Sequence, residues 1–234
     1  DRPAIATVLP SESGYSVMTD VGANVDAKPI NFLHFAIMGS AYAKVILHNE
    51  NPKVGLLSIG EEDVKGNEVT KTVFSLLKNS KGFNFTGNIE AKEIYKGKVD
   101  VIVCDGFVGN IALKSSEAVA NFVYKLLKDE IKSSILSKLG ALLMLPGLKR
   151  FKKRANYEEY GGAPLLGVNG ICIIGHGSSS AFAVQNAIRV AKEMVERNMN
   201  ESIRHDVANS LQIIQEAGIE AESDSKNSGD NGAE

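Results

Sequence analysis

Four apolar runs in this sequence each end in a short loop of glycines and small polar residues that opens into a helix-like pattern. In chain order the loops cover residues 20–24, 60–68, 105–110 and 175–178. Because the carboxyl ends of parallel strands share one edge of an open α/β sheet, we expect the four loops to meet there. Glycine-rich backbone and helix amino termini bind anions, so the pattern predicts a site for an anion such as phosphate.

Lys65 carries the strongest chemical signal, because it follows three acidic residues in the loop Gly60-Glu-Glu-Asp-Val-Lys65-Gly-Asn-Glu68. A lysine at the mouth of a helix can pair with phosphate or with a developing oxyanion. The alternative is a solvated surface charge beside the acids. The glycines on both sides of Lys65 favour the functional interpretation, because they let the backbone approach a ligand.

The other three loops each offer one or two polar side chains. Asn110 either donates its amide to a carbonyl oxygen or acts as a plain helix N-cap. Asp20, with Asn24 four residues on, either orients a ligand or caps its loop, and Asp105 fits a turn residue best. His176 lies between glycines and could bind phosphate or carry a proton, and a loop histidine without a partner is the alternative.

Several common mechanisms lack their motifs here. The sequence has no Gly-x-Ser-x-Gly elbow followed by acid and histidine, no Walker A loop, and no Gly-x-Gly-x-x-Gly after a first strand. The two cysteines, Cys104 and Cys172, fall in apolar runs without zinc-type spacing, so we expect buried, reduced thiols and a reducing compartment. An enzyme of this kind would use electrostatic stabilisation and positioning, with no cofactor and no metal.

The stretch from Ile131 to Arg154 gives a signal of a different kind. It combines apolar residues, a Pro146-Gly147 break and a basic cluster from Lys149 to Arg154. Apolar residues next to basic ones suit the surface of an anionic membrane. The alternatives are a dimer-forming helical hairpin with a solvated basic rim, or a docking site for an acidic protein.

The elements that must position these residues alternate between strand and helix. The pattern predicts strands at 4–9, 15–20, 54–59, 99–104 and 170–174, with a short strand and its turn at 84–88. It predicts helices at 29–48, 66–79, 110–137, 179–198 and 201–216. We therefore expect one α/β domain over 1–216 with a mostly parallel sheet covered on both faces, and a disordered acidic tail at 217–234.

Bulk properties narrow the function classes. A net charge of -2 over 234 residues argues against a general nucleic-acid binder. The sequence opens with no signal peptide, and no apolar run approaches the ~18 residues that span a bilayer. Its first residue is Asp and its next residues already read as a strand, which suggests that an upstream piece is missing, with a cleaved tag as the alternative.

The loops together resemble the phosphate acyltransferases of bacterial phospholipid synthesis, the acyl-carrier-protein:phosphate type (PlsX family). The matching pieces run in order across about residues 1–205. They are Gly22-Ala-Asn24-Val-Asp26-Ala-Lys28-Pro29, Phe35-Ala-Ile-Met38-Gly, Gly55-Leu-Leu-Ser-Ile-Gly60-Glu-Glu, Lys65-Gly-Asn67-Glu68, Asp105-Gly-Phe-Val-Gly109-Asn110, Tyr160-Gly-Gly-Ala-Pro164-Leu-Leu-Gly167 and His176-Gly-Ser178.

The resemblance implies a three-layer α/β/α fold like that of the isocitrate and isopropylmalate dehydrogenases, and a homodimer. It implies transfer of a fatty acyl group from acyl-carrier protein to inorganic phosphate, with Lys65 and Asn110 acting at the acyl carbonyl. The expected substrate-binding residues are Asp20, Asn24, Gly60, Glu61, Asn67, Asp105, Gly109, His176, Gly177 and Ser178. The hairpin at 131–154 would dock on an anionic membrane, with contacts at Leu139, Leu142, Leu143 and Leu145. The implied location is cytoplasmic and peripheral to the membrane.

The chain departs from the family at its start. The family carries Asp-Ala-Met-Gly-Gly-Asp and Ser-Ala-Gly-Asn-Thr-Gly patterns in an N-terminal segment, and neither occurs here. Two other functions stay open: a phosphotransacetylase-like enzyme that uses a coenzyme A thioester, and a catalytically silent membrane scaffold that binds acyl-carrier protein.

Overall fold

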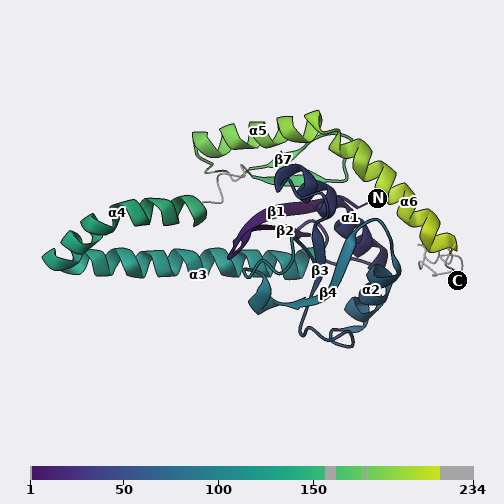
Figure 1. Ribbon diagram of the computed structural model, residues 1–234, viewed down its shortest axis with the longest axis horizontal. Helices are drawn as coiled ribbons and strands as arrows, with labels where there is room; N and C mark the ends of the chain where they lie inside the picture. The colour runs from purple at the N-terminus through teal and green to yellow at the C-terminus, as the bar shows by residue number, and fades with distance from the viewer. Residues whose placement is uncertain (1, 156–161, 176, 178, 217–234) are drawn as a thin grey trace, which may run out of the picture.

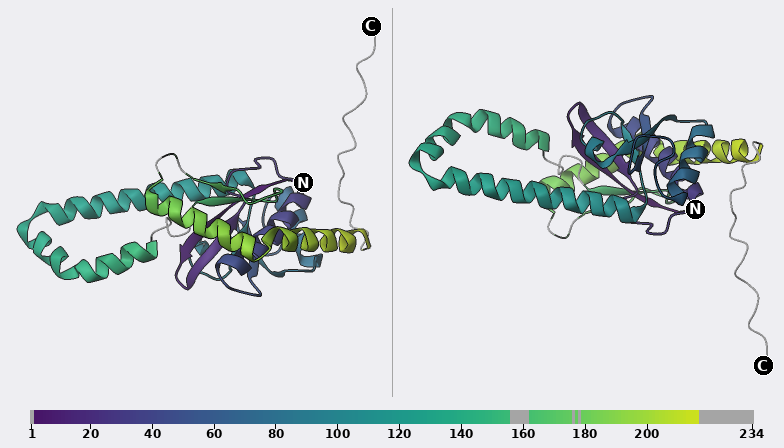
Figure 2. Two further views of the ribbon diagram at one scale, coloured as in Figure 1. Left: turned by 90° about the horizontal axis from the view of Figure 1, so that it is seen from above. Right: turned by 90° about the horizontal axis from the view of Figure 1, so that it is seen from below.

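The computed structural model describes residues 2–155, 162–175, 177 and 179–216, with main chain only for 152–155 and 210–216. The described chain forms a globular body and a long helical arm (Figure 1). Two further views show the same arm standing clear of the body (Figure 2). The tail expected at 217–234 lies outside the described residues.

A seven-stranded sheet, in the order β4-β3-β5-β2-β1-β6-β7, forms the frame of the body. Its strands are β1 (Ala4–Ser11), β2 (Gly14–Thr19), β3 (Lys53–Ser58), β4 (Asn84–Glu90), β5 (Val101–Val103), β6 (Ala163–Leu166) and β7 (Ile173–Ile174). The predicted strands are all present with shifted ends, and β4 continues through the expected turn at Gly87-Asn88. Strand β6 was not predicted.

The sheet is mixed, so the expectation of a mostly parallel sheet is wrong. Strands β2, β5, β3 and β4 run parallel to one another. Strand β1 pairs antiparallel with β2 and with β6, and β6 pairs antiparallel with β7. Only Glu12 and Ser13 connect β1 to β2, and a parallel pair would need a crossover of a dozen residues or more.

Helix α1 (Pro29–Ile46) is the centre of the main core and is buried almost all round. It contacts β2 and β5 on one side, and α2 (Glu68–Asn79), α5 (Ala181–Glu196) and α6 (Met199–Glu216) on the others. Gly39 allows this close packing, because a Cβ there would lie 2.6 Å from Thr19 Oγ1 and 2.7 Å from Val101 Cγ1. A helix that is apolar around its whole circumference is typical of a core element.

A second, smaller core lies on the opposite face of the sheet. Alternation along the strands sends Met18 and Ile102 to that face, where they are fully buried. The cover there is the segment 91–100, which includes the short 3₁₀ helix η1 (Ala91–Glu93), together with Ala112 and Leu113 of α3 (Gly106–Ser133). The start of α3 is thus fixed to the sheet through its first turns.

The arm is a hairpin of α3 and α4 (Ile135–Ala155) that meets at Ser134. It therefore includes most of α3 and extends beyond the range 131–154 expected from the sequence. Helix α4 continues through Pro146, where a break was expected. Apolar side chains along α3 stand exposed, namely Val119, Phe122, Val123, Tyr124, Leu126 and Leu127.

The arm also bears on the question of membrane contact. No single helix in the described part of the chain is long and apolar enough to cross a membrane. Helix α3 and residues Ile135–Phe151 of α4 pass the same test of length and composition only as a pair, which is bent by 120° at the break.

Candidate functional site

Three of the four predicted loops leave the same edge of the sheet. The loops with Asp20, Lys65 and Asp105 follow the carboxyl ends of β2, β3 and β5. These strands run parallel, and β5 lies between the other two. Neighbouring strands are about 4.8 Å apart, so the three loops are close neighbours. The predicted shared edge is confirmed for these loops.

The prediction is wrong for the fourth loop. Strand β6 ends at Leu166, which pairs with Ala4 at the edge where β2 ends. Strand β7 then runs back, with Ile174 opposite Ala163 at the start of β6. The unpredicted strand β6 thus reverses the chain, and residues 175–178 follow a strand that ends at the opposite edge. His176 and Ser178 lie outside the described residues, and Gly177 is an exposed turn residue.

Asp20 is the buried anchor of its loop. Its Oδ1 accepts hydrogen bonds from the backbone N–H of Ile5 at 3.0 Å and of Gly22 at 3.1 Å. Its Oδ2 accepts from the backbone N–H of Asn24 at 2.7 Å and from Asn24 Nδ2 at 2.8 Å. Asn24 Nδ2 also donates to the carbonyl of Pro3. Both side chains are therefore engaged within the protein, which matches the loop-capping alternative.

The start of α3 is clamped onto this loop. Asp105 is the N-cap of α3, and its Oδ1 accepts from the backbone N–H three residues on, at 2.8 Å. The N–H of Gly106 donates to the carbonyl of Asn24 at 2.7 Å. Gly109 lies so close to the loop that a Cβ would be 1.9 Å from the carbonyl oxygen of Asp20. The loop and the helix start form one rigid corner, here called the 20–24/105–109 corner.

Asn110 is presented by this corner. It is the fifth residue of α3 and is exposed, so the N-cap alternative is wrong because Asp105 holds that position. Its side chain lies beside Gly22, where an added Cβ would be 3.9 Å from Asn110 Cβ, Cγ and Oδ1. The amide therefore stands at the surface next to the loop that follows β2.

Lys65 belongs to a tightly wound loop. Its backbone N–H donates to the carbonyl of Glu62 at 3.0 Å, and a Cβ on Gly60 would lie 2.7 Å from Lys65 Cγ. Gly66 has a φ of +115°, a conformation that favours glycine. Asn67 caps α2 by accepting from the N–H of Thr70 at 2.8 Å, so its side-chain oxygen is engaged at the start of that helix. The ammonium group of the exposed Lys65 side chain is carried on this turn.

The corner and the Lys65 loop place a cation and an amide donor at the ends of adjacent strands. Cys104, also at this edge, donates its thiol to the carbonyl of Asp20 at 3.3 Å, and burial raises the pKa of that thiol. It is therefore poorly suited to act as a nucleophile. Cys172 is exposed, which corrects the expectation that both thiols are buried. The described residues contain no group of three or more His, Cys, Asp or Glu that could hold a metal ion.

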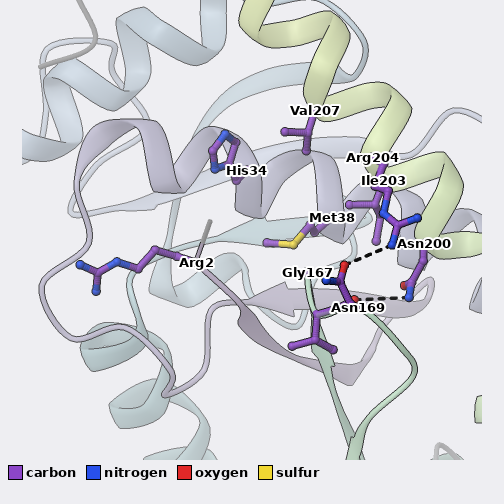
Figure 3. Close-up of a pocket in the computed structure, with 10 residues that line it drawn as sticks. Arg2, His34, Met38, Gly167, Asn169, Asn200, Ile203, Arg204 and Val207 are labelled. Atoms are coloured by element: carbon purple, nitrogen blue, oxygen red, sulfur yellow. Dashed lines mark hydrogen bonds between the residues drawn. The ribbon is translucent and has the colours of Figure 1, made fainter. Parts of the chain in front are cut away.

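A cavity of about 130 Å³ lies elsewhere, between α1, α6 and the turn that follows β6 (Figure 3). Arg204 and Asn200 of α6 hold that turn, through bonds to the side chain of Asn169 and the carbonyl of Gly170. Three strands, β5, β2 and β1, separate β6 from the strand that leads to Lys65. The turn after β6 leaves the same edge of the sheet as the loops with Lys65 and Asn110, but neither of these two residues lines the cavity.

His34 lines this cavity and makes the fold sensitive to acid. Burial lowers its pKa to about 4, whereas an unfolded chain has a histidine pKa near 6.5. Below pH 6.5 the unfolded chain binds a proton that the folded chain does not, so stability falls as the pH falls toward 4. We expect this residue to account for a loss of about 2–3 kcal/mol between pH 7 and pH 4.

Urea unfolding at several pH values tests this expectation. His34→Gln should flatten the stability profile between pH 4 and 7, and His205→Gln, at an exposed histidine of α6, should follow the unsubstituted chain. A His34→Gln profile that is parallel to that of the unsubstituted chain would contradict the assignment.

Residues 1–202 match the sequence model of a family described as "Fatty acid synthesis protein". Three similar proteins are each named "Phosphate acyltransferase". That of Pelotomaculum thermopropionicum is 56% identical over 207 residues, covering 88% of this chain and 60% of its own. The proteins of Halothermothrix orenii and Aquifex aeolicus are 53% and 52% identical, and 62% and 61% of their lengths are covered, with 88% of this chain in both cases. The chain thus spans about three fifths of the length of these relatives.

One solved structure shares the fold. The crystal structure of a branched-chain phosphotransacylase from Enterococcus faecalis V583 matches with a TM-score of 0.52 at 14% identity. The match covers 83% of this chain and 66% of that one. At this identity the likeness concerns the fold, and it supports an α/β fold with a mixed sheet.

Proposed function

This chain belongs to the family of fatty acid synthesis proteins, and we propose on that basis that it transfers a fatty acyl group from acyl-carrier protein to inorganic phosphate. The product is an acyl phosphate for phospholipid synthesis. Relatives more than half identical over most of the chain carry the name phosphate acyltransferase. The observation that carries the proposal is that Lys65 and Asn110 belong to the segments that follow the adjacent parallel strands β3 and β5 at one edge of the sheet.

The reaction needs no protein nucleophile. A phosphate oxygen attacks the thioester carbonyl carbon, the carbonyl electrons move to oxygen, and a tetrahedral oxyanion forms. Its collapse breaks the carbon–sulfur bond and releases the carrier's thiolate, which is then protonated. Lys65 Nζ and Asn110 Nδ2 donate to the oxyanion, and the lysine charge also favours departure of the thiolate.

The phosphate is proposed to bind near Lys65, between the Lys65 loop and the start of α3. The ammonium group offsets part of the phosphate charge, and helix amino termini attract anions. Asp105 already caps α3, and Asn67 caps α2, so these two residues shape the loops around the ligand. Glu61 pairs with Lys98 at 3.5 Å and thus serves the loop in the same way.

An acyl-transfer assay with two donors tests the proposal. Inorganic phosphate is supplied with either an acyl-carrier-protein thioester or the matching coenzyme A thioester, and acyl phosphate is trapped with hydroxylamine. The proposal expects product mainly from the carrier-protein thioester. Product mainly from coenzyme A would favour the phosphotransacetylase-like alternative, and binding of carrier protein without any product would favour the silent scaffold.

We further propose that the arm docks on an anionic membrane from the cytoplasmic side. Leu139, Leu142, Leu143 and Leu145 are all exposed on α4, with Leu143 at 84%. Lys149 and Arg150 follow on the same helix. Each basic residue near an anionic surface contributes about 1 kcal/mol, in addition to the burial of apolar side chains. Two other partners compete with the membrane in this proposal. One is a second copy of the chain that packs on these leucines, and the other is an acidic protein that docks on the arm.

The double variant Leu139→Glu plus Leu143→Glu is expected to abolish sedimentation with phosphatidylglycerol vesicles, because it places charges where apolar contacts form. Ser133→Glu plus Ser137→Glu adds the same charge at the tip of the arm without removing an apolar side chain, and should keep most of the binding. If the leucine variant instead converts a dimer to monomers, the dimer interpretation replaces the membrane one.

We also propose that the chain has a three-layer α/β/α architecture like that of the isocitrate and isopropylmalate dehydrogenases. The two cores on the two sheet faces and the helices over the larger one support this arrangement.

A further inference from the structure

We propose that Asn88, on strand β4, is the residue that positions Lys65 for acyl transfer. This inference rests on the proposed function, in which Lys65 acts at the acyl carbonyl. Asn88 is not in the Lys65 loop or at a strand end, and the sequence suggested only a turn at this point. The link between the two residues is a single carbonyl oxygen.

That oxygen belongs to Glu62. Its backbone carbonyl accepts one hydrogen bond from the N–H of Lys65 at 3.0 Å and a second from Asn88 Nδ2 at 2.9 Å. The Asn88 amide thus fixes the acceptor to which the Lys65 backbone is tied. Displacement of Glu62 would move Lys65 with it, because the two residues close one turn.

Partial burial distinguishes this tether from the other side-chain contacts of the loop. Asn88 is 8% exposed, so the donor side of its bond to the exposed Glu62 is protected from water. The loop's two ion pairs, Lys78–Asp63 at 2.9 Å and Lys98–Glu61 at 3.5 Å, have side chains between 49% and 61% exposed. Exposed pairs of this kind contribute little. The Asn88 bond is therefore the better protected of the described side-chain tethers that hold the loop.

Asparagine is also unfavourable for stability at this position, and its presence there supports a specific role. It lies inside a strand, opposite Leu56 of β3, where β-branched and aromatic residues are preferred. A buried amide destabilises the fold unless its hydrogen bonds are made. Its Nδ2 meets that condition through the Glu62 carbonyl, while its buried Oδ1 accepts no hydrogen bond within the described residues. The position thus keeps an asparagine despite an unpaired oxygen, with the bond to Glu62 as the contact that its amide makes.

The test combines kinetics with a readout of the loop itself. Asn88→Ala should lower kcat for acyl phosphate formation about tenfold with little change in KM for the acyl donor, since small displacements of a catalytic group slow the chemical step. Asn88→Asp keeps the size but turns an oxygen toward the Glu62 carbonyl, so it should not restore the rate. Asn79→Ala removes a similar amide bond, to the Ser75 carbonyl of α2, and is the matched control.

A double-variant cycle separates positioning from general damage. If Asn88 acts through Lys65, Asn88→Ala should cause no further loss in the Lys65→Ala background. Hydrogen exchange in peptide 60–67 should be faster in Asn88→Ala, with peptide 105–115 unchanged. A further tenfold loss in the Lys65→Ala background, or unchanged exchange in peptide 60–67, would overturn the proposal. Full activity of Lys65→Ala would instead reject the catalytic role of Lys65, and the exchange result would still decide whether Asn88 holds the loop.

Discussion

Replacement of Lys65 or Asn110 by alanine is expected to lower the rate of acyl phosphate formation by ~10²–10³-fold in each case. Each variant loses one donor to the oxyanion, which exists only after the phosphate has attacked. The loss should therefore appear in kcat, with KM for the acyl donor nearly unchanged. The rate is followed as hydroxylamine-trapped product, with the chain extended to the length of its relatives.

The two sites offer matched controls. Asn121 lies eleven residues beyond Asn110, about three helical turns along the same face of α3, and is exposed. Lys71 is an exposed lysine one turn into α2 that pairs only with Glu68 on its own helix. Asn121→Ala and Lys71→Ala should retain normal rates. Near-normal turnover in both Lys65→Ala and Asn110→Ala would reject the proposed roles.

Gly109→Ala is expected to lower the free energy of unfolding by about 1–3 kcal/mol or more, as overpacking does in a tight contact. The added Cβ would lie 1.9 Å from the Asp20 carbonyl oxygen and 2.9 Å from Cys104 Sγ. Neither neighbour can move freely, because Asp20 belongs to the 20–24/105–109 corner and the buried Cys104 donates its thiol to the same Asp20 carbonyl. The start of α3 would be forced off the loop, and Asn110 would move with it.

Gly140→Ala provides the comparison in urea unfolding. Gly140 is also inside a helix, and an added Cβ there meets nothing within 4 Å. Both substitutions gain the same intrinsic preference of alanine for helix, about 0.5–1 kcal/mol. The difference between the two variants therefore measures the close contact at Gly109. Equal stabilities would mean that the corner is not as tightly packed as described.

The sequence predicted those parts of the site that depend on neighbours along the chain. Asp105-Gly106-Phe-Val-Gly109-Asn110 indicated a strand end, a cap and a helix start, and the structure has each of them, with the cap at Asp105, five residues before the Asn110 of the cap alternative. Gly60 and Gly66 indicated a loop around Lys65, and both glycines lie in the turn that carries this residue. Local composition carries this information because caps and turns are decided by a few adjacent residues.

The direction of the strands could not be predicted from adjacent residues in the same way. Strand β6 has four residues, one of them Pro164, and a proline within a run argues against a strand. Missing β6 meant missing the reversal that sends β7 to the other edge. The role of Asn88 was hidden for a related reason. Gly87-Asn88 is typical of a turn, whereas in the structure β4 continues past an extra residue, Thr86, that has no partner between Val54 and Gly55 of β3. Pairings between distant segments decided both cases.

The two limbs of the arm join at Ser134 and stand clear of the body, and among the described residues the arm is attached through the base of α3 (Figure 2). At about 1.5 Å per residue, the 28 residues of α3 give the arm a reach of some 40 Å. The length of the arm does not depend on the core. Removal of the same number of whole turns from both helices would shorten the arm and leave its junction with the body unchanged. Deletions of this kind in homologous enzymes can change the distance between the reacting groups and the surface that the tip of the arm contacts. The residues that carry out the reaction stay the same.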